Sequence, residues 1–279
     1  MVKVSRKALL GLLASSITIP LLDLYIIEPE FTVTVTRIEL NIKKRLPGLG
    51  KYRVVHISDT HFGSSKFKAI YDIVLNIVKK LNPDLIVYTG DLISRKAFLY
   101  EAINFVEKLS NISQVYIVWG NWDHWSLGKD ILAFRKLLES INNVRVLVNE
   151  NIEVEDRFYV VGVDDPHTMH DRLDRALHGI KEDSMIVLLT HSPEIVDKAA
   201  NRVDIILAGH THGGQVVLPL LGPLYVPLPR KYRRYVSGLF KVGETYMYVN
   251  RGIGTSILPI RFMCSPEVTC LDFKWDASQ

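Results

Sequence analysis

The stretch VDIILAGHTHGGQ, residues 203–215, decides how the rest of this chain is interpreted. Its first six residues are mostly apolar, which predicts a buried strand of an α/β sheet, and such strands present functional residues at their carboxyl ends. His210 and His212 follow on a loop, so both rings can point to one place without a helix. The flanking glycines allow close backbone approach. The pattern indicates a metal site, although a lone His-x-His pair could also be two surface histidines.

Four more apolar strands are expected to end in polar residues that can bind metals. These strands are predicted at 52–57, 84–88, 114–119 and 185–190. The polar residues that follow them are Asp59 and His61, Asp91, Asn121 and Asp123, and His191. Helices are expected over 67–81, 96–109 and 130–140, between the strands. Strands that alternate with helices predict a layered α/β fold whose site lies along the carboxyl-end edge of its sheet.

The rest of the chain reads mostly as β structure. Alternating apolar residues over 31–36 predict a half-exposed strand. Further strands are expected at 144–148, 152–155, 158–163, 235–240, 245–250 and 268–273. Together with the segments above, they fill one large domain.

Composition excludes several classes of protein. The 279 residues are 48% hydrophobic and 23% charged, which is typical of a globular chain. A net charge of +4 is too small to argue for a nucleic-acid polymer as partner. The two cysteines, Cys264 and Cys270, form no disulfide framework and are expected to be free thiols. His56 is expected in the core, whereas His167, His170 and His178 are interpreted as surface residues.

The N-terminal residues differ in kind from the rest. Lys3, Arg6 and Lys7 precede an apolar run over 8–27 that is interrupted by Pro20 and Asp23. This pattern predicts an export signal or membrane anchor over 1–30, followed by a single domain over 31–279; a core helix is the alternative. Residues 5–10 also resemble a degenerate twin-arginine signal. The charges that precede the run predict a membrane-associated protein whose domain lies on the extracytoplasmic side.

Five motifs occur in an order that resembles the metal-binding signature of the calcineurin-like metallophosphoesterase superfamily. They are Asp59-x-His61, Gly90-Asp91, Gly120-Asn121-x-Asp123, His191 and Gly209-His210-x-His212. The resemblance covers roughly residues 50–275. It implies an α/β fold in which two mixed β-sheets pack face to face between flanking helices, a four-layer α/β/β/α sandwich. The tail over 251–267 resembles the membrane-associated bacterial and archaeal branch, whose relatives include lipid-headgroup pyrophosphatases of the UDP-diacylglucosamine type.

The resemblance also implies a ligand set for two divalent ions. Asp91 would bridge the ions, with Asp59, His61 and His212 on the first and Asn121, His191 and His210 on the second. Two such ions can hold a phosphoryl group and activate a water. Imidazole, amide and carboxylate donors suit manganese, iron or zinc better than calcium. Taken singly, the aspartates could instead cap helices and Asn121 could be a turn residue.

One position departs from the family. Most members have a histidine after the metal-binding asparagine, and it helps to protonate the leaving group; here that residue is Trp122. His124 is the candidate for this catalytic role, with Asp123 as the residue that orients it. The alternative is that His124 is only a loop residue. Trp122 and Trp125 could shape the pocket wall or pack in the core.

A proline-rich apolar segment over 218–229 follows His210 and His212. It suggests a groove for an acyl chain or a surface that docks on a membrane. Beside it, positive charge for an anionic headgroup could come from Arg230, Lys231, Arg233 and Arg234. The alternative is a packed crossover with a solvated basic turn.

We therefore expect a metal-dependent phosphoric ester hydrolase that cleaves a phosphodiester or pyrophosphate of a lipid-linked or nucleotide substrate. A broad phosphomonoesterase or protein phosphatase is the alternative, and a non-catalytic metal-binding module is a third. The expected partners are the phosphate ester or lipid-headgroup substrate and, through the N-terminal segment, a membrane.

Overall fold

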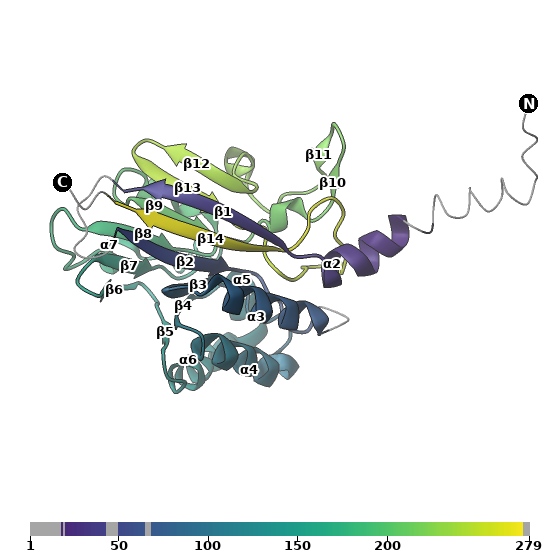
Figure 1. Ribbon diagram of the computed structural model, residues 1–279, viewed down its shortest axis with the longest axis horizontal. Coiled ribbons are helices and arrows are strands. Elements are labelled where there is room, and N and C mark those ends of the chain that lie inside the picture. Colours follow the sequence, from purple (N-terminus) through teal and green to yellow (C-terminus); the bar gives the residue numbers. More distant parts are fainter. Residues whose placement is uncertain (1–17, 19, 43–49, 65–67, 276–279) are drawn as a thin grey trace, which may run out of the picture.

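Two six-stranded β-sheets pack face to face, and helices cover their outer surfaces (Figure 1). The computed structural model describes residues 18, 20–42, 50–64 and 68–275. The strand order is β1-β14-β2-β3-β4-β5 in the first sheet and β12-β13-β9-β8-β7-β6 in the second. This arrangement confirms the predicted α/β sandwich of two mixed sheets with flanking helices.

The strands of the first sheet are β1 (Thr34–Asn41), β2 (Lys51–Ile57), β3 (Leu85–Thr89), β4 (Gln114–Val118), β5 (Val144–Val146) and β14 (Glu267–Lys274). Those of the second are β6 (Glu150–Val154), β7 (Phe158–Gly162), β8 (Met185–Leu189), β9 (Ile205–Ala208), β12 (Gly238–Val242) and β13 (Thr245–Val249). A small hairpin joins β10 (Val217–Leu218) to β11 (Gly222–Pro223).

The α-helices are α2 (Glu28–Phe31), α3 (Ala69–Leu81), α4 (Leu99–Ser110), α5 (Asn121–Leu127), α6 (Ile131–Glu139), α7 (Leu173–Ala176) and α8 (Val196–Ala199). A π-helical turn, η1 (Asp23–Ile27), precedes α2. Single 3₁₀ turns are η2 (Lys96–Phe98), η3 (Gly128–Asp130), η4 (Pro193–Ile195), η5 (His212–Gly214) and η6 (Arg230–Tyr232).

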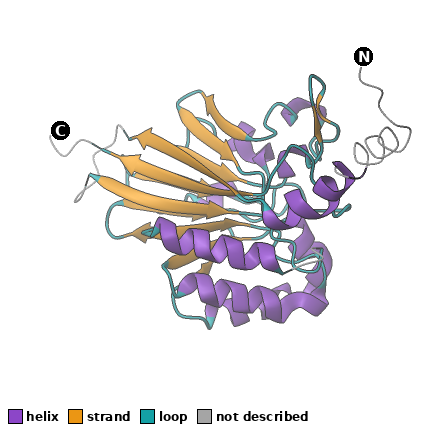
Figure 2. Cartoon of the chain, turned by 45° about the vertical axis from the view of Figure 1, so that its right-hand side comes forward, coloured by secondary structure: helices purple, strands orange, loops and turns teal. Residues whose placement is uncertain are grey.

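Each sheet has a parallel centre. Strands β2 to β5 run parallel in the first sheet, and β7, β8, β9 and β13 run parallel in the second. Strand β14 is antiparallel to β2, β6 is antiparallel to β7, and β12 is antiparallel to β13; in each pair the partner lies nearer the centre of the sheet. The carboxyl ends of the parallel strands therefore meet along one edge of each sheet, where the connecting loops gather (Figure 2).

Three apolar layers hold the sandwich together. Side chains such as Val87 of β3 and Leu207 of β9 fill the space between the sheets. Helices α3, α4 and α6 cover the outer face of the first sheet, with residues such as Val74 and Phe134 buried there. A third cluster, which includes Ile195, lies outside the second sheet. Burial on both faces explains why the central strands are nearly continuous apolar runs.

Several local predictions agree with the structure. Helix α3 ends where Asn82 takes a left-handed conformation with φ of 47°, directly before Pro83. Cys264 and Cys270 are free, as predicted, and both are buried. His56 lies in the core, where its Nε2 is 2.8 Å from Thr89 Oγ1. The main difference is α5, a helix where a loop was expected.

The predicted membrane-associated, extracytoplasmic location was wrong. In the part of the chain that the structure describes, no helix combines the length and apolar character needed to cross a membrane. The described end of the predicted segment also carries Asp23, Glu28 and Glu30, and the last two are buried against the domain. Residues 1–17, with the twin-arginine-like stretch, lie outside the described residues. The boundary at 30/31 stays a prediction.

The packing between the sheets predicts a large effect for one core residue. Leu207 of β9 is completely buried, so Leu207→Ala should lower the free energy of unfolding by about 3 kcal/mol through lost burial and a cavity. Leu132→Ala on the exposed side of α6 is the matched control and should change it by less than about 0.5 kcal/mol. Chemical denaturation measures both. Equal effects of the two variants would contradict this account of the core.

Candidate metal centre

The polar residues that follow the parallel strands meet at the shared carboxyl-end edge. Asp59 follows β2, Asp91 follows β3, and Asn121 follows β4 in the first sheet. His191 follows β8 and His210 follows β9 in the second. Since the two sheets face each other, the side chains from one sheet reach those from the other. The sequence thus brings all seven predicted ligands to one place.

A first cluster joins Asp59, His61 and His212, all of them buried. The Nε2 atoms of the two histidines are 3.0 Å apart. Asp59 Oδ1 lies 3.4 Å from His212 Nε2 and 3.8 Å from His61 Nε2. Three electron-donor atoms that converge this closely are suited to a cation placed between them.

A second cluster is built around His191. Its Nε2 lies 3.0 Å from Asn121 Oδ1, 3.1 Å from His210 Nδ1 and 3.2 Å from Asp91 Oδ2. One ring nitrogen donates at most one hydrogen bond, so three neighbours at this distance exceed what hydrogen bonding can satisfy. The donor set therefore fits a second cation.

Asp91 belongs to both clusters. Its Oδ2 is 3.4 Å from His61 Nε2 in the first cluster and 3.2 Å from His191 Nε2 in the second. Its other oxygen, Oδ1, accepts a hydrogen bond of 2.8 Å from the backbone N–H of Trp122. The carboxylate is thus held by the start of α5 and presents its free oxygen between the clusters. Together these residues are suited to a dinuclear metal site.

Hydrogen bonds on the far side of the rings fix which nitrogen faces the site. His191 Nδ1 donates to the Thr89 carbonyl at 2.8 Å, and His210 Nε2 donates to the Pro227 carbonyl at 2.9 Å. A carbonyl accepts only, so the nitrogen that faces the site keeps its lone pair in a neutral ring. His61 Nδ1 pairs with Ser94 Oγ at 2.8 Å. Such outer partners are typical of metal-binding histidines.

Burial keeps most of these rings neutral, as metal ligands must be. It lowers the pKa of His61 to about 4 and that of His210 to about 3. Burial also raises the pKa of Asp59 to about 7. His191 differs, because the negative charges of Asp91 and Asp59 outweigh its burial and raise its pKa. Without a cation, a proton on His191 balances the charge of Asp91.

The backbone around the site is strained. Asp59, His61, Asp91, His210 and His212 all have positive φ values, between 48° and 72°. Non-glycine residues rarely adopt this left-handed region, and strained residues of this kind gather at functional sites. A methyl group on Gly120 would lie 2.2 Å from Asp91 Oδ1, and one on Gly209 would lie 2.3 Å from Asp59 Oδ2. Both glycines are therefore required for the carboxylates to fit.

The Asp123 carboxylate, which was expected to orient His124, accepts hydrogen bonds from backbone N–H groups. Its Oδ2 accepts from the N–H of Gly120 at 3.0 Å, and its Oδ1 accepts from Leu92 at 2.9 Å and Ile93 at 3.2 Å. It therefore caps α5 and fastens the segment after Asp91 to it. Within the described residues, no hydrogen bond joins the Asp123 carboxylate to the His124 ring.

His124 lies beside the site and does not line the cavity described below. Its Nε2 is 2.7 Å from Asp164 Oδ1, and its ring stacks on His170 with centroids 4.3 Å apart. Asn121, Trp122 and Trp125 of α5 line the cavity, whereas His124 lies on the neighbouring side of the helix, where its ring contacts Asp164 and His170. The catalytic role of His124 stays a prediction.

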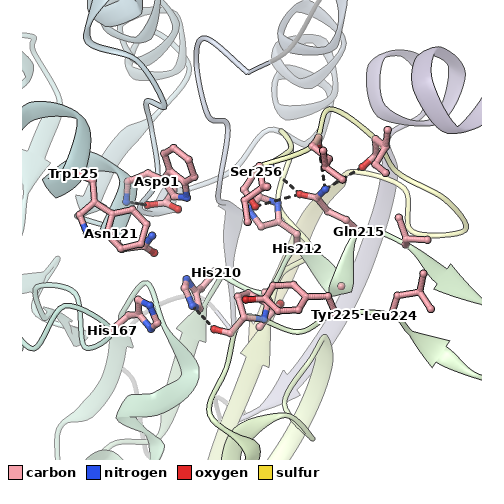
Figure 3. A pocket seen from close by; sticks show the side chains of 18 of the residues that line it. Asp91, Asn121, Trp125, His167, His210, His212, Gln215, Leu224, Tyr225 and Ser256 are labelled. Carbon is pink, nitrogen blue, oxygen red and sulfur yellow. Dashed lines mark hydrogen bonds between the residues drawn. The ribbon is translucent and has the colours of Figure 1, made fainter.

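A cavity of about 630 Å³ opens from the two clusters (Figure 3). At one end it is lined by Asp91, Asn121, His210 and His212. The remaining lining is largely apolar: Leu24, Trp122, Trp125, Val216, Leu224, Tyr225, Pro227, Ile257, Leu258 and Ile260. The proline-rich segment and both tryptophans therefore contribute to its wall.

His167 was missed from the sequence, where it was interpreted as a surface residue. It is half-buried, lines the cavity, and its ring centroid lies 4.7 Å from that of His210. Its Nδ1 is 2.9 Å from Glu194 Oε1, and this hydrogen bond raises the pKa of His167. One signal could have found it: His167 comes soon after the carboxyl end of β7, the same position as the other site residues.

Most of the basic residues after the proline-rich segment contact protein groups outside the cavity. Lys231 pairs with Asp197, Arg233 Nε donates to the Leu228 carbonyl, and Arg234 donates to the Tyr235 hydroxyl. Arg230 is exposed. None of the four lines the cavity, so their binding of substrate stays a prediction.

The fold and the paired clusters are those of a metal-dependent phosphoester hydrolase. The profile of the calcineurin-like phosphoesterase family matches residues 52–214, more than half of the chain, and this chain belongs to that family. The assignment confirms the superfamily and the hydrolase class expected from the motifs.

Two curated relatives match most of this chain. The uncharacterized metallophosphoesterase YkuE of Bacillus subtilis is 30% identical over 81% of this chain and 80% of its own length. The phosphodiesterase YaeI of Escherichia coli is 30% identical over 79% of this chain and 82% of its own. A solved structure, TT1561 of Thermus thermophilus, covers 72% of this chain and 90% of its own with a TM-score of 0.49 and 13% identity.

The protonation of the site predicts pH-dependent metal binding. Because the pKa of Asp59 is raised to about 7, a cation must displace a proton below that pH, and the raised pKa of His191 adds a second. Manganese affinity should rise between about pH 6 and about pH 8, with proton release. Titration calorimetry in buffers of different ionisation enthalpy measures both. Affinity that is constant with pH, without proton release, would contradict this assignment.

Proposed function

We propose that this enzyme hydrolyses a phosphodiester or pyrophosphate in which one side carries an apolar group, such as a lipid-linked phosphate. The observation that carries the proposal is the continuity of the cavity. One end is lined by Asp91, Asn121 and His210, and the cavity continues between apolar walls that include Trp125 and Tyr225. A phosphate group at the polar end leaves room along the apolar walls for its substituent.

In this proposal the two clusters each hold one divalent ion. Asp59, His61 and His212 bind one, Asn121, His191 and His210 bind the other, and Asp91 contacts both. When bound, such a pair of ions makes a water more acidic and offsets the charge of the phosphoryl group. The mixed nitrogen and oxygen donors favour manganese, iron or zinc.

Trp122 supports a diester or pyrophosphate over a phosphomonoester. Its backbone N–H holds Asp91, while its side chain lines the cavity and contacts the His61 ring at a centroid distance of 5.6 Å. An apolar wall beside the phosphate suits a substituent better than the free oxygens of a monoester. The relative YaeI carries the name phosphodiesterase, which agrees with this choice.

His167 is the side chain that we propose for contact with the leaving group. It shares the cavity with the ligand His210, and Glu194 fixes its ring through Nδ1. His124 is hydrogen-bonded to Asp164 and does not line the cavity. A histidine that is oriented by a carboxylate is suited to hold a proton near a departing oxygen.

The bridging position of Asp91 predicts a severe defect. Asp91→Asn should lower manganese-dependent hydrolysis of a p-nitrophenyl diester by at least about a hundredfold, because the amide lacks the charge that joins the clusters. His178→Ala, at an exposed histidine outside the site, is the control and should keep the parent rate. A fully active Asp91→Asn enzyme would refute the ligand assignment.

Mutation can distinguish the catalytic roles of His167 and His124. His167→Ala should lower kcat for the same diester by on the order of a hundredfold, since a positioned proton donor typically contributes this much. His124→Ala should lower kcat far less, because its ring points to Asp164. Steady-state kinetics with manganese in excess gives both values. The reverse order would return the catalytic role to His124.

A further inference from the structure

The helical segment before the first strand is fastened to the domain through a buried carboxylate. Glu28 is only 5% exposed, and its two oxygens accept hydrogen bonds from the N–H groups of Met263 at 2.7 Å and Cys264 at 2.5 Å. The Ser265 hydroxyl donates a third at 3.1 Å. Charge-assisted hydrogen bonds of this kind are stronger than neutral ones. The segment is thus held in a defined place.

A second contact lies one turn earlier. The Leu24 carbonyl accepts a hydrogen bond of 3.0 Å from the N–H of Arg261. Both contacts reach the loop over 251–265, which follows β13. Figure 1 shows α2 at the end of the molecule where β10 and β11 project, close to this loop.

That loop is part of the site. The Arg261 side chain is fully buried, and its guanidinium donates to the carbonyls of Arg251, Gly252, Gly254 and Cys264. The loop in turn bonds to the ligand segments: the Gly254 N–H donates to the Asp59 carbonyl at 2.6 Å, and Cys264 Sγ donates to the His212 carbonyl at 3.2 Å. Its position is therefore coupled to the positions of two proposed ligands.

The loop and the helical segment also form the apolar end of the cavity together. Ile257, Leu258 and Ile260 line it from the loop, and Leu24 lines it from η1. Ile257 and Leu258 are 77% and 57% exposed, so in the described structure they offer apolar surface that a bound substrate would cover. Leu24 is a residue of the N-terminal segment whose side chain reaches this surface.

We infer that the helical segment over 20–31 is a wall of the substrate site, where Leu24 contacts the apolar substituent of the substrate. Glu28 is the positioning residue, because it fixes the segment against the loop that carries Ile257, Leu258 and Ile260. This inference rests on the proposed function. The residues that would select the substituent of the substrate lie outside residues 52–214, the range that the family profile matches. The segment therefore helps to determine specificity.

A pair of diesters with the same leaving group tests the inference. The probes are p-nitrophenyl methyl phosphate and p-nitrophenyl dodecyl phosphate, assayed with manganese on the full chain. The measured quantity is the preference, defined as kcat/KM for the dodecyl ester divided by kcat/KM for the methyl ester. Leu24→Ala should lower this preference by on the order of tenfold, because apolar contact with the chain is lost. Leu22→Ala, on an exposed position of the same segment, should keep the parent preference.

A second variant tests the positioning role. Glu28→Gln keeps the size of the side chain but offers one accepting oxygen to the three donors. It should raise KM for the dodecyl ester with little change in kcat, whereas a general loss of structure would lower the active fraction and hence kcat for both esters. Equal losses on both esters in Leu24→Ala would overturn the inference while leaving the phosphodiesterase proposal intact. If the parent chain cleaves neither ester, the proposed function itself fails.

Discussion

The site depends on one constraint: two carboxylates and four imidazoles are packed together where water is excluded. Asp59 and Asp91 are buried, and like charges in such surroundings repel unless positive charge lies between them. A proton on His191 can offset one of them, as its raised pKa indicates. Two divalent ions would more than offset both carboxylate charges.

The fold meets that constraint through its strands and loops. Parallel strands in two facing sheets deliver the ligands to one edge, and five of the seven ligands have the left-handed backbone conformation: Asp59, His61, Asp91, His210 and His212. Gly120 and Gly209 leave the space that the carboxylates fill. Backbone carbonyls at Thr89 and Pro227 then orient two of the rings. The free energy cost of this backbone strain is offset by the packing of the large apolar core behind the loops.

Much of this arrangement could be predicted from the sequence, because each ligand lies within four residues of the end of an apolar strand. The place of His124 could not, since the stretch after Gly120 resembles a turn, and only the cap formed by Asp123 shows that a helix begins there. His167 was missed because its segment lacks a familiar motif. The contact between Glu28 and Cys264 joins residues 236 positions apart, and no local pattern encodes such a pairing. Local periodicity predicts elements, whereas tertiary packing decides which side chains line the cavity.

The most direct test of the dinuclear centre is a crystal structure of the manganese-loaded protein with anomalous diffraction measured at the manganese edge. This account predicts two anomalous peaks about 3.5 Å apart, with the Asp91 carboxylate between them. One peak should contact Asp59, His61 and His212, and the other Asn121, His191 and His210. A single peak, or peaks away from Asp91, would contradict it.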